Sequence, residues 1–208
     1  MPERLVDDAV SPVVTATEVV FAGHVWSVRR DTFELEGDTI TREYIDHTGA
    51  VAVFAMDERD RVLLIKQYRH PVRSRDWELP AGLLDLAGES PLVGAQRELA
   101  EEVDLVAESW SLLSEFMTTA GGSNEVIRVY LARGVSATAE AFARTEEEAG
   151  IELRWVPLDE LVDAVLARDV QNSILVIAAL SAQAARDRGW STLGDAESPW
   201  PRHPVNRS

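Results

Sequence analysis

Short runs of β-branched and aromatic residues fill the chain between residues 15 and 130, and they constrain its fold more than any other feature. Turn-forming residues separate these runs, so the first half of the chain is predicted to be rich in β-strands. One segment departs from this pattern. Ser90 is a natural N-cap, Pro91 suits the first helical position, and apolar residues then recur at helical spacing until about Asp104. The pattern predicts an α+β protein in which one helix interrupts the strands of the first half.

The rest of the chain is predicted to contain a further strand, at 152–158, and two helices, at 158–167 and 173–188. Its last residues are rich in Ser and Pro and have no periodicity, which is typical of a flexible tail. The predicted organisation is an N-terminal β segment over residues 1–48, a central domain over 49–190 and a flexible tail over 191–208.

The composition limits the classes of function. Apolar residues make up 46% of the chain and charged residues 27%, as in ordinary globular proteins. No apolar run reaches the roughly 18 residues of a membrane span, and the first residues lack the pattern of a secretory signal, so we expect a cytoplasmic protein. The net charge of −16 argues against nucleic acid or a membrane as partner. With no cysteines, a metal ion would have to be held by oxygen atoms or by the four histidines.

The predicted helix carries an unusual concentration of negative charge in the stretch RELAEE, residues 97–102. Glu98 lies three and four residues before Glu101 and Glu102, so the three carboxylates share one helix face, and each like-charged pair costs about 0.2 to 0.5 kcal/mol. The last two also lie in the final turn, where the helix dipole disfavours anions. This face is either a solvated acidic surface or a site for cations.

The residues around this stretch resemble the Nudix box, the pattern G-x5-E-x7-R-E-U-x-E-E-x-G-U in which U is a large aliphatic residue. Seven residues separate the first glutamate from the arginine, as the pattern requires. The matching positions are Gly82, Glu89, Arg97, Glu98, Leu99, Glu101, Glu102 and Leu105.

Two positions depart from the box. Six residues rather than five lie between Gly82 and Glu89, and Asp104 stands where the family usually has glycine. The extra residue lengthens a loop, where Gly88 can adopt an unusual backbone angle. Asp is among the few residues that tolerate a left-handed conformation at a helix end. Neither departure removes a carboxylate, so we expect the cation site to be intact.

The resemblance implies a Nudix fold, a mixed β-sheet sandwiched between helices and preceded by an N-terminal antiparallel β-sheet segment, with residues 49–190 as the catalytic domain. It implies Mg²⁺ or Mn²⁺, more than one ion per site. The implied metal ligands are Glu98, Glu101, Glu102 and the backbone carbonyl of Ala81.

Three further box residues have implied supporting roles. Gly82, Glu89 and Arg97 would support the structure of the box. For Glu89 and Arg97 two alternatives remain: an ion pair that ties the loop to the helix, or a direct part in catalysis.

Four features resemble the ADP-ribose pyrophosphatase branch of the family: Gln67-Tyr68-Arg69, the WELPAG stretch that leads into the box, GGSNE and Asn172-Ser173-Ile174. The resemblance covers roughly residues 15–185. It implies hydrolysis of ADP-ribose to AMP and ribose 5-phosphate. Ala120 stands where this branch usually has proline, so a pyrophosphatase of another nucleoside diphosphate sugar is the alternative. A non-catalytic ADP-ribose-sensing module is another, although the chain keeps all four glutamates of the box.

The resemblance also suggests substrate-binding residues. Arg69 is a candidate pyrophosphate ligand, because a guanidinium group matches phosphate oxygens; the alternative is a surface arginine at a strand end. Arg42 is either a substrate ligand or an exposed strand residue, and Glu125 either accepts ribose hydroxyls or caps a turn. Glu78 is a further substrate-binding candidate.

A mobile loop after the box often supplies the glutamate that activates water in such enzymes. In this chain the matching segment is Glu146-Glu147-Glu148. Glu148 is the first candidate for the catalytic base, Glu147 the second, and Glu101 completes the catalytic candidates. Three adjacent loop glutamates can also simply be solvated.

The N-terminal strands are predicted to bind a second copy of the chain. In the resembling enzymes this region pairs with the other subunit of a homodimer and helps to form the adenine site. Residues 24–35 and 39–45 would do so here, with Trp26 or Tyr44 either contacting adenine or only packing at the interface.

Overall fold

The computed structural model describes residues 4–139 and 151–204. They form two compact units. The first contains the described residues up to His47 together with Thr119–Asn124, and the second contains the remainder. Each unit is described separately. No helix of the described residues is long and apolar enough to cross a membrane.

The first unit is a three-stranded antiparallel sheet in the order β1-β2-β3. A two-residue turn joins β2 to β3, and both of its residues, Glu36 and Gly37, have positive φ, as a type I′ hairpin requires. Every residue of β1 is exposed. The strands are β1 (Val13–Ala22), β2 (Ser27–Leu35) and β3 (Asp38–Asp46).

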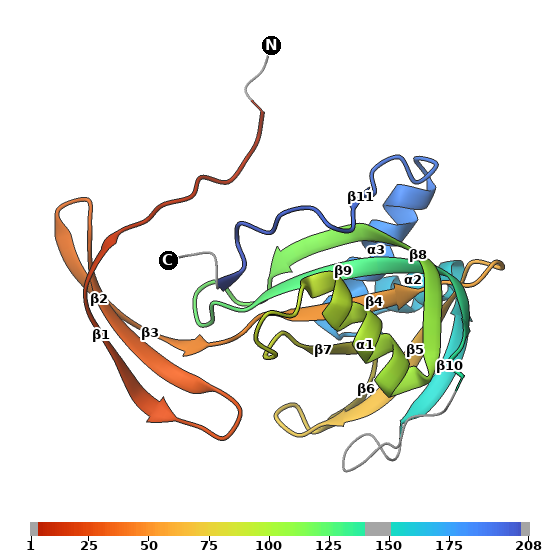
Figure 1. Ribbon diagram of the computed structural model, residues 1–208, viewed down its shortest axis with the longest axis horizontal. Coiled ribbons are helices and arrows are strands. Elements are labelled where there is room, and N and C mark those ends of the chain that lie inside the picture. Colours follow the sequence, from red (N-terminus) through yellow and green to blue (C-terminus); the bar gives the residue numbers. More distant parts are fainter. Residues whose placement is uncertain (1–3, 140–150, 205–208) are drawn as a thin grey trace. The chain divides into compact units, whose positions relative to one another are not determined.

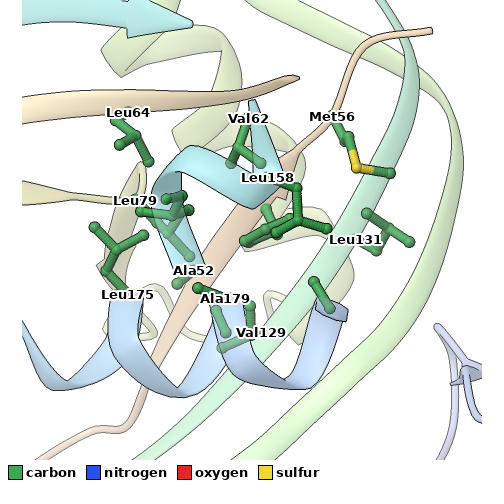
Figure 2. Packing of buried hydrophobic residues seen from close by; sticks show 14 of the residues in the cluster. Ala52, Met56, Val62, Leu64, Leu79, Val129, Leu131, Leu158, Leu175 and Ala179 are labelled. Carbon is green, nitrogen blue, oxygen red and sulfur yellow. The ribbon is translucent and has the colours of Figure 1, made fainter. Parts of the chain in front are cut away.

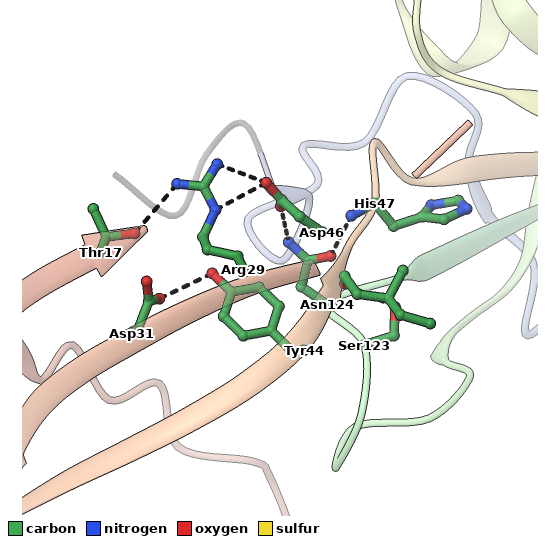
Figure 3. Close-up of polar contacts among 9 residues, drawn as sticks. Thr17, Arg29, Asp31, Tyr44, Asp46, His47, Ser123 and Asn124 are labelled. Carbon is green, nitrogen blue, oxygen red and sulfur yellow. Dashed lines mark hydrogen bonds and ion pairs between the residues drawn. The ribbon is translucent and has the colours of Figure 1, made fainter. Parts of the chain in front are cut away.

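The loop Thr119–Asn124 belongs to this unit because it binds the end of β3. Gly122 O accepts a hydrogen bond from Ile45 N at 2.9 Å. The Asn124 side chain accepts from His47 N at 2.7 Å and donates to Asp46 at 2.8 Å (Figure 3). A loop from the middle of the chain is thereby fixed to the N-terminal sheet.

Among the described residues, the second unit contains two sheets and three helices (Figure 1). The larger sheet has the order β11-β8-β9-β4-β7, and it is mixed because β4 and β9 run parallel. The smaller has the order β10-β5-β6. Their strands are β4 (Ala50–Ala55), β5 (Arg61–Arg69), β6 (Ser74–Glu78), β7 (Ala81–Leu83), β8 (Leu105–Met117), β9 (Val126–Ala137), β10 (Glu152–Pro157) and β11 (Gly194–Asp195).

Helices cover both faces of this mixed sheet. All six residues of β4 are buried, and they alternate between two hydrophobic clusters. Ala52 packs with α2 (Leu158–Ala167) and α3 (Ser173–Arg186). Figure 2 shows Leu158 of α2 and Leu175 and Ala179 of α3 in this cluster. Val53 packs with α1 (Pro91–Val103) on the other side. The predicted α+β class and the mixed sheet between helices are confirmed.

The C-terminal segment differs from the flexible tail that the sequence predicted. Its described residues, 191–204, include strand β11, which pairs with β8, and the buried side chains of Ala196 and Trp200. Arg128 on β9 donates to the carbonyls of Ser198 and Pro199 at 2.8 and 3.2 Å. Long-range contacts, those of Arg128 among them, therefore hold a segment that has no periodicity of its own.

Candidate active site

Helix α1 begins and ends as its sequence indicates. Ser90 accepts a hydrogen bond from Val93 N at 3.3 Å, and Pro91 occupies the first helical position. The C-cap is Asp104, with a left-handed backbone at φ 54°. Gly88, in the loop before the helix, has φ +81°. Asp104 therefore has the left-handed backbone that Asp tolerates, and the lengthened loop contains a glycine in a conformation that glycine adopts readily.

Arg97 holds the acidic residues of the box together. Its Nε and Nη2 donate to the two carboxylate oxygens of Glu89 at 2.9 and 3.0 Å, and its Nη1 donates to Glu98 at 2.6 Å and Glu101 at 3.1 Å. Hydrogen bonds from Arg97 hold the pKa of Glu89 below its ordinary value. The ion pair between the loop and the helix is therefore present, and a direct catalytic part of Glu89 and Arg97 stays a prediction.

Glu98 and Glu102 both lie against the short strand β7. Glu102 is buried, and its carboxylate accepts a hydrogen bond from Ala81 N at 2.9 Å. A Cβ built on Gly82 would overlap the carboxyl group of Glu98. Because glycine has no side chain, the carboxylate can lie directly beside the strand backbone. The first glycine of the box thus has a steric reason to be glycine.

The chemistry of these groups fits a divalent cation. Carboxylate and carbonyl oxygens are the ligands that Mg²⁺ and Mn²⁺ prefer, and the space at Gly82 allows the Glu98 carboxylate to lie against the backbone of the residue that follows Ala81. The described residues contain no closed cluster of three or more acidic or histidine side chains around one point. Arg97 instead compensates the charge of Glu98 and Glu101.

Arg69 and Glu78, two of the predicted substrate-binding residues, contact each other across β5 and β6. Arg69 Nε donates to Glu78 Oε1 at 2.9 Å and Nη2 donates to Oε2 at 2.6 Å. The Glu78 side chain is 5% exposed, whereas that of Arg69 is 44% exposed. The buried carboxylate fixes the orientation of a guanidinium group that reaches solvent.

The structure places Arg42 and Glu125 in different units. Arg42 is exposed on β3 of the first unit, and its Nη1 donates to the carbonyl of Thr41 at 2.8 Å. Glu125 belongs to the second unit and accepts a hydrogen bond from Thr118 Oγ1 at 2.5 Å. This bond links the two residues that flank the loop Thr119–Asn124. Substrate binding by both residues stays a prediction.

The candidate aromatic residues of the first unit both have partners. The ring of Trp26 stacks on that of His47, with centroids 5.8 Å apart. Tyr44 Oη donates to Asp31 at 2.9 Å, and burial, aided by this hydrogen bond, raises the pKa of Tyr44 to about 12 (Figure 3). The proposed bases Glu147 and Glu148 lie outside the described residues.

Asn124 is a positioning residue that the sequence did not single out. It joins Asp46 to the backbone of His47, and Asp46 is itself held by Arg29 through hydrogen bonds of 2.9 and 2.6 Å (Figure 3). The GGSNE segment marks the position of Asn124 in the sequence. Nothing local predicts its partners, which lie 77 and 78 residues away.

Comparisons with known proteins agree with this geometry. The chain is 42% identical over 170 residues to the ADP-ribose pyrophosphatase of Mycobacterium tuberculosis, covering 81% of this chain and 82% of that protein. It is 37% identical over 163 residues to the methanol dehydrogenase activator of Bacillus methanolicus, covering 78% and 87%. A crystal structure of an ADP compounds hydrolase has the same fold, with a TM-score of 0.71 at 21% identity over 88% of this chain and 99% of that one. The model of the NUDIX domain matches residues 46–180, which is more than half of the chain, and the protein therefore belongs to the Nudix hydrolase family.

Proposed function

We propose that the protein hydrolyses the pyrophosphate bond of ADP-ribose to give AMP and ribose 5-phosphate. The observation that carries this proposal is the arrangement of α1 against β7. There Glu98 and Glu102 hold their carboxylates beside the backbone of Gly82 and Ala81. The similarity to a protein named ADP-ribose pyrophosphatase supports this substrate.

Glu98 and Glu102 are the principal metal ligands in this proposal, with Glu101 and the carbonyl of Ala81 as further oxygen donors. Divalent cations, Mg²⁺ or Mn²⁺ and more than one per site, would neutralise the diphosphate and lower the pKa of the attacking water. Arg97 forms ion pairs with both Glu98 and Glu101 and so keeps the two carboxylates close together.

The remaining roles follow from the substrate. Arg69, oriented by Glu78, binds the pyrophosphate oxygens, while Arg42 and Glu125 contact the rest of ADP-ribose. Water attacks one phosphorus atom and the bond from that atom to the bridging oxygen breaks. The water's proton passes to a base, for which Glu148 is the first candidate, before Glu147 and Glu101.

The proposal is tested by phosphate-coupled turnover of ADP-ribose, ADP-glucose, GDP-mannose, NADH and diadenosine polyphosphates with Mg²⁺, for the wild type and for Glu102→Gln. The glutamine keeps an oxygen that can accept from Ala81 N but loses the charge that a cation needs. We expect ADP-ribose to be the fastest substrate. The variant should lose at least about 100-fold in activity, which is the usual effect of removing one electrostatic contact to the transition state. Glu58→Gln, the same change in an exposed turn, is the control.

Two results would replace this proposal by an alternative. Faster cleavage of another sugar nucleotide would keep the metal site and change the substrate. Tight binding of ADP-ribose without turnover of any compound would indicate a sensing module.

The assembly and the location of the protein are parts of the same proposal. We propose a homodimer formed through the N-terminal strands, in which Trp26 or Tyr44 contributes to the adenine site. The cytoplasm, where nucleotide substrates and Mg²⁺ occur, is the proposed location. The net charge of −16 favours cations and small-molecule substrates over nucleic acid or membranes as partners.

A further inference from the structure

The loop Thr119–Asn124 lies between β8 and β9 and is held in shape by hydrogen bonds. Two of these bonds are internal, since Gly122 N and Ser123 N both donate to the carbonyl of Thr119 at 2.9 Å. The loop also contains two adjacent glycines, and a Cβ added at Gly121 would meet no atom within 4 Å. Because glycines give the backbone conformational freedom, the shape of this loop depends on the groups that bind it.

Three polar side chains, those of Arg29, Asp46 and Asn124, fix the end of this loop to the N-terminal sheet (Figure 3). Arg29 on β2 donates twice to Asp46 Oδ2, at 2.9 and 2.6 Å. The other oxygen, Asp46 Oδ1, accepts from the Asn124 amide at 2.8 Å, and Asn124 Oδ1 accepts from His47 N at 2.7 Å. The Asn124 amide thus has both a donor and an acceptor as partners, which fixes its orientation. We call these three residues the loop anchor.

Asn124 directly precedes Glu125, whose backbone is fixed on both sides. On one side, Val126 is buried at the start of β9, and on the other side lies the loop anchor. The Glu125 carboxylate accepts a hydrogen bond from Thr118 Oγ1 at 2.5 Å. Loss of the loop anchor would free one of these two sides and widen the range of positions that the carboxylate can take. A group that binds substrate is effective only in a narrow range of positions.

We propose that Asp46 and Asn124 are positioning residues that set the affinity for ADP-ribose through Glu125. This inference rests on the proposed function, in which Glu125 contacts the substrate. The proposed metal ligands on α1 and β7 belong to the second unit, whereas Asp46 and Asn124 belong to the first. Loss of the loop anchor should therefore raise KM and leave kcat and the Mg²⁺ dependence nearly unchanged. This is the pattern of an interaction that substrate and transition state share.

The test exchanges the two polar groups of the bond between Asp46 and Asn124. Asn124→Asp sets one carboxylate against another, so the KM for ADP-ribose should rise about 10-fold through the lost hydrogen bond and the repulsion of like charges. Adding Asp46→Asn places an amide donor opposite the new carboxylate and restores the net charge of the wild type. The double variant should therefore recover most of the loss in KM.

Two further variants separate positioning from a general loss of stability, which urea unfolding of each variant monitors. In the background of Glu125→Ala, Asn124→Asp should not raise KM further, because the side chain that it positions is absent. Asn172→Asp makes the same chemical change at the N-cap of α3, where a carboxylate can also accept from Leu175 N. This control should change neither KM nor kcat.

An unchanged KM in Asn124→Asp would overturn the proposal, as would an equal rise in the double variant or an undiminished effect in the background of Glu125→Ala. Failure of the proposed hydrolysis would differ from these results, because the wild type itself would show no turnover. The same variants are then compared by calorimetric titration of ADP-ribose in EDTA. A weaker Kd in Asn124→Asp that the double variant recovers would support positioning, whereas an equal Kd, or no binding by the wild type, would overturn it.

Discussion

At the scale of single residues, Gly82 determines where the Glu98 carboxylate lies. A methyl group at this position would overlap that carboxylate, so Gly82→Ala must displace Glu98 from the backbone of β7. We expect the variant to lose about 100-fold in Mg²⁺-dependent ADP-ribose turnover, on the order of the effect of displacing a catalytic group by 1 Å. A Mg²⁺ titration of turnover should show weaker activation than in the wild type.

Gly121→Ala is a suitable control for the effect of an added methyl group on folding, because that methyl would meet no atom within 4 Å. Full activity of Gly82→Ala would show that the position of the Glu98 carboxylate is not required for the reaction.

The ion pair of Arg97 and Glu89 makes a second prediction at this scale, for the dependence of stability on pH. Arg97 holds the pKa of Glu89 below its ordinary value of 4.5, so the folded state binds this proton less readily than the unfolded state. The resulting stabilisation is fully present above pH 4.5 and is lost as the pH falls through the lower, folded-state pKa. In urea unfolding at several pH values, Glu89→Gln should therefore lower stability at pH 7 more than at pH 3. An equal loss at both pH values would contradict this linkage.

At the scale of elements, sequence predicts best where the signal is local. The cap at Ser90, the proline after it and the apolar spacing of α1 all lie within that helix, and the helix begins and ends where these residues indicate. The attachment of the loop Thr119–Asn124 to the N-terminal sheet has no such signal, because the bonds of the loop to Ile45 and His47 join segments far apart in the chain. Order in the C-terminal segment likewise depends on Arg128, about 70 residues earlier in the chain.

Trp200 tests whether the C-terminal segment is a packed element. The residue is 5% exposed, and its ring lies against the Arg128 guanidinium. Trp200→Ala should lower the free energy of unfolding by about 3 kcal/mol, the usual cost of truncating a buried aromatic side chain, as measured by urea unfolding. Pro201→Ala, at an exposed neighbouring position, should change it much less. A loss of less than about 0.5 kcal/mol for Trp200→Ala would favour the flexible tail instead.

At the scale of the whole molecule, the sequence predicts which carboxylates belong to the candidate site. It predicts the residues that these carboxylates contact only in part. The spacing from Glu98 to Glu102 places both on one helix face, and the ion pair of Glu89 with Arg97 was one of two open alternatives. The contact of Arg69 with Glu78 depends on the register of β5 and β6, which the sequence does not specify. The sequence does not predict the division into two units either, because the loop Thr119–Asn124 joins the first unit through bonds to residues far away in the chain.

The first unit also leads to a prediction about assembly. Every residue of β1 is exposed, including the apolar Val19 and Phe21 at 53% and 63%. Apolar residues gathered on an exposed sheet, together with an unpaired strand edge, are typical of a surface that binds another chain. We therefore expect light scattering after gel filtration to give twice the chain mass of 23.0 kDa at micromolar concentration.

Changing β1 should separate the subunits. Two charges introduced by Val19→Asp with Phe21→Asp would have to be buried without partners in the dimer, so this variant should elute as a monomer. Val106→Asp with Leu166→Asp makes the same chemical change at exposed positions of the second unit, at 46% and 61%, and should leave the mass of the dimer unchanged. If β1 also forms part of the adenine site across the interface, the β1 variant should show a raised KM for ADP-ribose that the control does not. A wild type that is monomeric at these concentrations, or a β1 variant that stays dimeric, would contradict assembly through this strand.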